Sequence, residues 1–64
     1  MPKTNVKVKL VGEDNNAGAI MGRVTTAMRE AGIDKAIISA YRLEAISGDY
    51  NHLLRTTMEY VEVK

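Results

Sequence analysis

The spacing of apolar residues changes abruptly near the start of this sequence, and this change constrains the fold more than any other feature. Apolar and charged residues alternate over residues 6–10, which is the pattern of a half-buried strand. Residues 12–16 then have the composition of a turn with an Asn cap, and from residue 17 to 31 apolar residues recur every third or fourth position. The sequence therefore predicts a strand, a turn and an amphipathic helix in immediate succession.

The rest of the chain predicts two further helices and a second strand. Gly32 is suited to stop the first helix in the left-handed conformation, and Asp34 and Asp49 are suited to cap the helices that follow. The expected elements are helices over residues 35–46 and 50–56 and a strand over residues 57–63.

The predicted fold class is α+β. No linker or repeat interrupts residues 1–64, so we expect a single small domain with the order β-α-α-α-β. The N- and C-terminal strands are expected to pair antiparallel, and Lys7 and Lys9 can then lie across from Tyr60 and Glu62.

The size of the chain predicts self-association. A chain of 64 residues without cysteine has a small core and no disulfide to support it. Apolar residues surround most of the predicted second helix, so a single neighbour in the same subunit cannot cover them. Two strands also leave an open sheet edge on each side. We therefore expect a homo-oligomer, either a dimer or a dimer of dimers.

The charge of the chain argues against DNA and membranes as partners. Nine basic and eight acidic side chains are interspersed and give a net charge of +1, which creates no broad field attracting DNA or an anionic membrane. A helix-turn-helix is disfavoured because its second helix would have to read bases with the apolar residues at 36–40. With no signal peptide and no membrane-spanning run, the sequence predicts a cytoplasmic protein.

Catalytic residues and metal ligands are not expected. His52 is the only imidazole and the chain has no thiol, so a nucleophile cannot be matched with a base and an orienting group. Glu13 and Asp14 are not followed by the alternating oxygen ligands of a calcium loop. We therefore predict a non-enzymatic protein with no cofactor and no bound metal.

The first predicted helix contains a candidate ligand surface. Gly18 and Gly22 form a strip without side chains, and Arg23 follows it with a guanidinium suited to a phosphate. Close helix packing is the simpler interpretation of the two glycines. A salt bridge to Glu13 or Glu30 is the simpler interpretation of Arg23.

A second candidate surface lies in residues 47–54. Tyr50 is suited to stack on a base, and His52 is suited to read a polar base edge. The alternative is structural, with Tyr50 packed beside Tyr41 and His52 exposed on a helix.

Three motifs carry a resemblance: VKLVGED at residues 8–14, AIMGRV at 19–24 and SGDYNHLL at 47–54. Together they resemble a widespread family of very small proteins encoded by bacteriophages and prophages. The chain also looks like the anti-CBASS sponge proteins of phages, which are compact oligomers that sequester cyclic dinucleotide alarm signals such as 3′,3′-cGAMP.

This resemblance implies a sponge that binds a cyclic dinucleotide in the host cytoplasm and blocks CBASS anti-phage defence. It implies a phosphate contact at Arg23 and base stacking by Tyr50 or Tyr41. The implied polar selectors are Asn15, Asn16 and His52. The alternative is a small phage protein-interaction module that inhibits or adapts a host protein through an apolar helix face.

Overall fold

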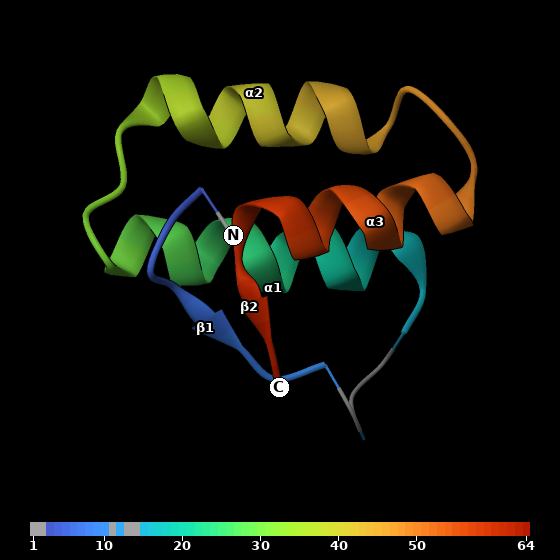
Figure 1. Ribbon diagram of the computed structural model, residues 1–64, viewed down its shortest axis with the longest axis horizontal. Helices are drawn as coiled ribbons and strands as arrows, with labels where there is room; N and C mark the ends of the chain where they lie inside the picture. Colours follow the sequence, from blue (N-terminus) through green and yellow to red (C-terminus); the bar gives the residue numbers. More distant parts are fainter. Residues whose placement is uncertain (1–2, 11, 13–14) are drawn as a thin grey trace.

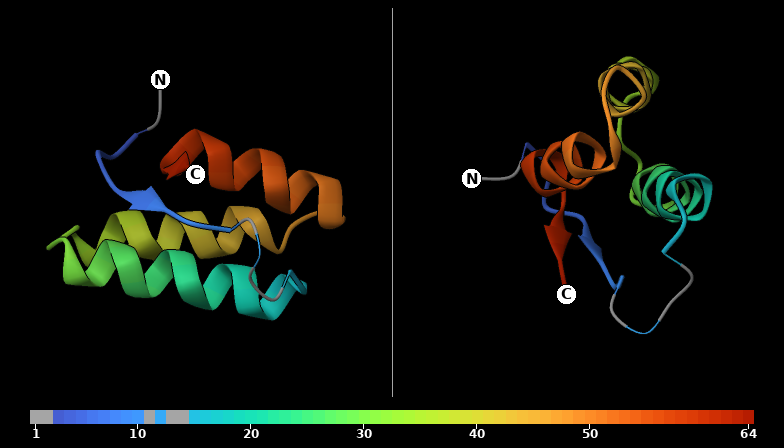
Figure 2. Two further views of the ribbon diagram at one scale, coloured as in Figure 1. Left: turned by 90° about the horizontal axis from the view of Figure 1, so that it is seen from below. Right: turned by 90° about the vertical axis from the view of Figure 1, so that its right-hand side faces the viewer.

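The computed structural model describes residues 3–10, 12 and 15–64, and most of these residues are helical (Figure 1). The elements are β1 (Lys7–Val8), α1 (Ala17–Glu30), α2 (Lys35–Ala45), α3 (Tyr50–Tyr60) and β2 (Glu62–Val63). Seen end on, the helices form a triangle, and the strands lie against α1 and α3 on the side away from α2 (Figure 2). The sheet is therefore a minor part of a helical protein.

The two strands pair parallel, so the predicted α+β class with antiparallel terminal strands is wrong. Lys7 is the register partner of Glu62, and Val8 that of Val63. The alternation of apolar residues identifies the buried face of a strand but contains no information on its direction. The helices determine the direction of β2. Helices α1 and α3 run in the same direction and α2 runs in the opposite direction (Figure 1). The chain therefore enters β2 parallel to β1.

The third helix is longer than predicted and includes residues 57–60, which the sequence assigned to the final strand. Its buried residues recur at helical spacing, and they are Leu53, Thr56, Thr57 and Tyr60. Threonine and tyrosine favour strands when considered alone. Here the burial of one helix face outweighs that local preference.

The core lies between the three helices of the described chain and the inner face of the strands. Tyr41 of α2 is its largest fully buried side chain. The Tyr41 ring meets the Tyr60 ring edge to face, with 5.4 Å between the ring centroids. The Tyr41 hydroxyl shares a hydrogen bond of 2.7 Å with the Thr57 hydroxyl, which satisfies both groups inside the core.

The predicted helix starts are confirmed. Asn16, Asp34 and Asp49 each accept a hydrogen bond of 2.8 to 2.9 Å from a backbone N–H of the first helical turn. Gly32 follows α1 with φ at +79°, the left-handed conformation predicted for it. Local residue chemistry therefore determined where these helices begin.

Candidate ligand-binding site

A hollow with three basic side chains and one acidic side chain in its lining lies between β1 and α1. Lys7 and Lys9 of β1 and its extension line one wall, and Arg23 lines the other with the carboxylate of Glu30 further along α1. The hollow measures about 620 Å³ and is open to solvent. We call it the β1–α1 hollow.

Gly22 leaves a short stretch of α1 main chain exposed in the wall of the β1–α1 hollow. Apart from the chain neighbours and the nearby backbone of α1 itself, a Cβ atom added to Gly22 would meet no described atom within 4 Å, and one added to Gly18 would meet only Asn16 Oδ1 at 3.5 Å. The helix packing expected at the two glycines is therefore not made by another helix of this subunit. Because glycine inside a helix costs about 1 kcal/mol relative to alanine, the bare main chain at Gly22 is a feature that a ligand or a second molecule would explain.

Asn15, Asn16 and Tyr50 meet at the start of α1. The Tyr50 hydroxyl donates a hydrogen bond of 2.5 Å to the main-chain oxygen of Asn15. Asn16 caps α1 through Ala19, which also lines the β1–α1 hollow. Tyr50 as a whole residue is 41% exposed, and an exposed tyrosine offers a surface on which a base can stack.

Tyr41 lies in the core, so its predicted stacking on a ligand base is corrected. Its ring is fully buried and its hydroxyl is bonded to Thr57. Burial raises the pKa of Tyr41 above its ordinary value, and the hydrogen bond with Thr57 opposes part of that increase. Apolar residues surround α2, so the sequence pattern could not identify which side faces the core.

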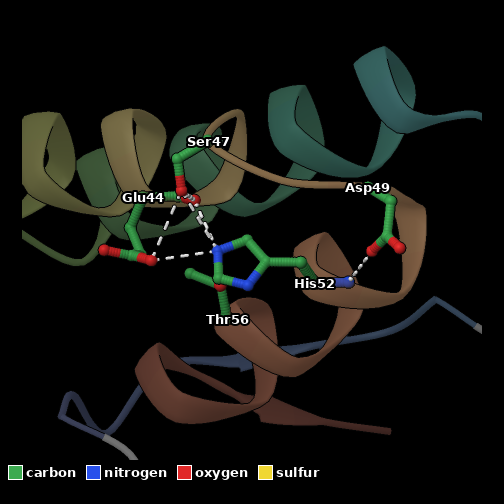
Figure 3. A network of polar contacts seen from close by, with 5 residues as sticks. All are labelled: Glu44, Ser47, Asp49, His52 and Thr56. Atoms are coloured by element: carbon green, nitrogen blue, oxygen red, sulfur yellow. Dashed lines mark hydrogen bonds and ion pairs between the residues drawn. The ribbon is translucent and has the colours of Figure 1, made fainter.

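His52 joins the end of α2 to the start of α3 (Figure 3). Its Nε2 atom lies 2.9 Å from both the main-chain oxygen and Oε2 of Glu44, and 3.2 Å from Oγ of Ser47. Both Glu44 atoms are acceptors, so Nε2 carries the hydrogen. The structure therefore gives His52 a role in holding the α2–α3 turn, and it does not bring His52 to the β1–α1 hollow with Arg23.

We expect two glycine substitutions to have opposite effects on stability. A Cβ at Gly48 would approach Cγ of His52 to 2.8 Å, so Gly48→Ala should push the ring off Glu44 and cost about 1–2 kcal/mol. Gly22→Ala meets open space and should add up to about 1 kcal/mol through helix propensity. Urea unfolding followed by circular dichroism measures both changes. Equal effects of the two substitutions would contradict the described packing.

Lys7 and Lys9 are the site residues that the sequence did not identify. Their alternation with valines indicated only the solvent face of a strand. A strand followed directly by a helix usually packs against that helix. This rule could have predicted that the lysines of β1 lie near Arg23 of α1. The sequence predicted Glu30 only as a salt-bridge partner of Arg23, and its side chain also lines the β1–α1 hollow.

The described residues contain no cluster of His, Asp and Glu side chains that could hold a metal ion. Glu13 and Asp14, considered for a calcium loop, lie outside the described residues. No helix in the described chain has the length and apolarity needed to cross a membrane. Comparisons of the chain with protein-family models, curated proteins and solved structures found no match.

Proposed function

We propose that this protein is a non-enzymatic sponge that binds a cyclic dinucleotide, such as 3′,3′-cGAMP, in the β1–α1 hollow. The observation that supports this proposal is the placement of Lys7, Lys9 and Arg23 around the open main chain of Gly22. Guanidinium and ammonium groups form charge-assisted hydrogen bonds with phosphate oxygens. The volume of about 620 Å³ lies within the range of small-molecule sites, roughly 300–1,000 Å³.

The role follows from the resemblance to phage sponge proteins together with the site. A protein that binds the alarm signal in the host bacterial cytoplasm lowers its free concentration, so that the CBASS effector is not triggered. Sequestration requires tight binding and a supply of protein, without turnover. Phosphates bound by Lys7, Lys9 and Arg23 would provide most of that binding energy.

A thermal-shift screen against cyclic di- and trinucleotides tests the proposal. A ligand at a hundredfold excess over its Kd stabilises the folded state by about 2.7 kcal/mol, which corresponds to an increase in Tm of roughly 10 °C or more for a domain of this size. After denaturation of the protein, the bound nucleotide should be recovered intact. The absence of any shift contradicts the proposal, and recovery of linear products would indicate a nuclease instead.

The exposed side of α2 supports a second candidate, a module that binds a host protein. Leu43 and Ile46 are 68% and 64% exposed. With Met21 and Arg42 they line a hollow of about 330 Å³. Exposed apolar groups of this kind favour burial against a partner protein. Leu43→Glu with Ile46→Glu distinguishes the two functions, because it should remove host-protein binding and leave nucleotide binding unchanged.

A further inference from the structure

The outer edge of β2 has main-chain groups without a partner in the described chain. Glu62 and Lys64 turn their main-chain groups towards β1, since their N–H groups donate to Val6 and Val8 oxygens at 2.8 Å. Main-chain groups alternate in direction along a strand. The N–H and C=O of Val63 therefore point away from β1, towards the side where no other described segment lies (Figure 2).

An apolar hollow adjoins this edge. It measures about 250 Å³ and is lined by Leu10, Leu54, Met58 and Val63. Met58 of α3 is 55% exposed, so its apolar side chain adds to the surface that a partner could cover. A strand placed along the outer edge of β2 would bring its own side chain next to Val63 and cover this hollow.

We propose that β2 pairs antiparallel with β2 of a second copy of this chain, with the two-fold axis at Val63. In a hydrogen-bonded antiparallel pair, two opposed residues exchange both of their N–H to oxygen bonds. The N–H group of each Val63 would thus donate to the main-chain oxygen of the other Val63. These groups form no hydrogen bond with β1 in the described chain. The result is a continuous sheet of the order β1-β2-β2-β1 across the dimer.

Charge complementarity supports a second copy as the occupant. With Val63 opposite Val63, Glu62 stands opposite Lys64 of the partner subunit, and the symmetry repeats this pair. The outer edge of β1 does not offer complementary charges to a second copy. If β1 paired with β1 of the copy, Lys7 and Lys9 would lie opposite the lysines of the partner subunit. Pairing through β2 also leaves the β1–α1 hollow of each subunit open, so this inference does not depend on the proposed function.

A single introduced cysteine tests the register directly. The chain has no cysteine of its own, so Val63→Cys can form a disulfide only with its copy. Opposed residues of a hydrogen-bonded pair have Cα atoms about 5.5 Å apart, which a disulfide spans. Mild oxidation should convert Val63→Cys to a covalent dimer about tenfold or more faster than the control Asn51→Cys, which is exposed on α3. Equal rates would overturn the proposal.

Sedimentation equilibrium of variants tests the same interface without a cross-link. Lys64→Glu should raise the Kd of the dimer about tenfold, because it opposes a glutamate to Glu62 of the partner subunit and leaves the Lys7–Glu62 register pair within each subunit unchanged. Adding Glu62→Lys to Lys64→Glu should restore part of that affinity, because the charges across the two-fold axis are then complementary again. Chemical synthesis with an N-methyl group on Val63 should raise the Kd by about tenfold or more, since it removes the donor at the axis.

These outcomes separate the β2 interface from any other. A wild-type chain that stays monomeric at millimolar concentration overturns the proposal. So does a dimer that tolerates N-methylation of Val63 or that the double charge exchange does not restore, because its interface then lies elsewhere. Circular dichroism of each variant shows that the subunit itself remains folded.

Discussion

Tyr41→Ala is expected to unfold most of the protein at room temperature. The ring is fully buried and packs edge to face on Tyr60, and removing a buried aromatic ring typically costs about 3–5 kcal/mol. A domain of this size has roughly that much stability in total. Tyr41→Phe keeps the ring and loses only the bond to Thr57, so it should cost about 1 kcal/mol. Urea unfolding monitored by circular dichroism measures both variants.

A double-mutant cycle tests whether the stability lost in Tyr41→Phe comes from the hydrogen bond between the Tyr41 and Thr57 hydroxyls. Thr57→Val strands the buried Tyr41 hydroxyl and should cost about 1–3 kcal/mol, whereas Tyr41→Phe with Thr57→Val removes both partners and should cost less than the sum of the single changes. If Tyr41→Ala instead keeps its fold and loses nucleotide binding, Tyr41 is a ligand residue and its assignment to the core is wrong.

Alkaline unfolding provides a further readout of the same residue. Burial raises the pKa of Tyr41 in the folded state, so the unfolded chain loses this proton first. The resulting contribution to stability is complete below about pH 10, the ordinary pKa of tyrosine, and is lost as the pH rises through the raised value. The wild-type protein should therefore lose more stability than Tyr41→Phe between neutral and strongly alkaline pH.

Arg23→Ala is expected to weaken binding of a cyclic dinucleotide by about tenfold to more than a hundredfold. This range corresponds to roughly 1.5–3 kcal/mol, the contribution of a hydrogen bond to a charged group. Arg23→Lys should recover only part of the loss, because an ammonium lacks the planar fork of the guanidinium. Isothermal titration measures these affinities.

Glu30→Gln is the matched control for Arg23→Ala, because both side chains line the β1–α1 hollow. It removes a negative charge near the proposed phosphates and should tighten binding severalfold, by roughly 0.5–1 kcal/mol. Unchanged affinity in Arg23→Ala, with the fold intact, would remove Arg23 from the site. Weaker binding in Glu30→Gln would show that the hollow does not hold an anion.

The parts of the fold that depend on neighbouring residues in the sequence could be predicted, and the parts that depend on packing could not. Asn16, Asp34 and Asp49 cap helices with their own side chains, so the residue type alone located the helix starts. The direction of β2 depends on how three helices stack in between. Thr57 belongs to α3 because it lies on the helix face that is buried in the core, where its hydroxyl bonds to Tyr41, 16 positions away in the sequence.

The same distinction applies to the candidate site. Arg23 was identified from its residue type beside Gly22, and both line the β1–α1 hollow. Lys7 and Lys9 reach that hollow only because β1 packs against α1. The alternation of apolar and charged residues in a strand does not show which helix the strand packs against. The polar ring of His52 predicted a contact with a ligand, whereas in the structure this ring contacts Glu44.

Chemical-shift mapping by NMR tests the central claim most directly, because a chain of 64 residues gives a well-resolved amide spectrum. Titration with 3′,3′-cGAMP should move the amide signals of Lys7, Lys9, Gly22 and Arg23, the residues around the β1–α1 hollow. Signals of Leu43 and Ile46 on the exposed side of α2 should stay in place. A spectrum that millimolar nucleotide leaves unchanged, or changes confined to α2, would contradict the account.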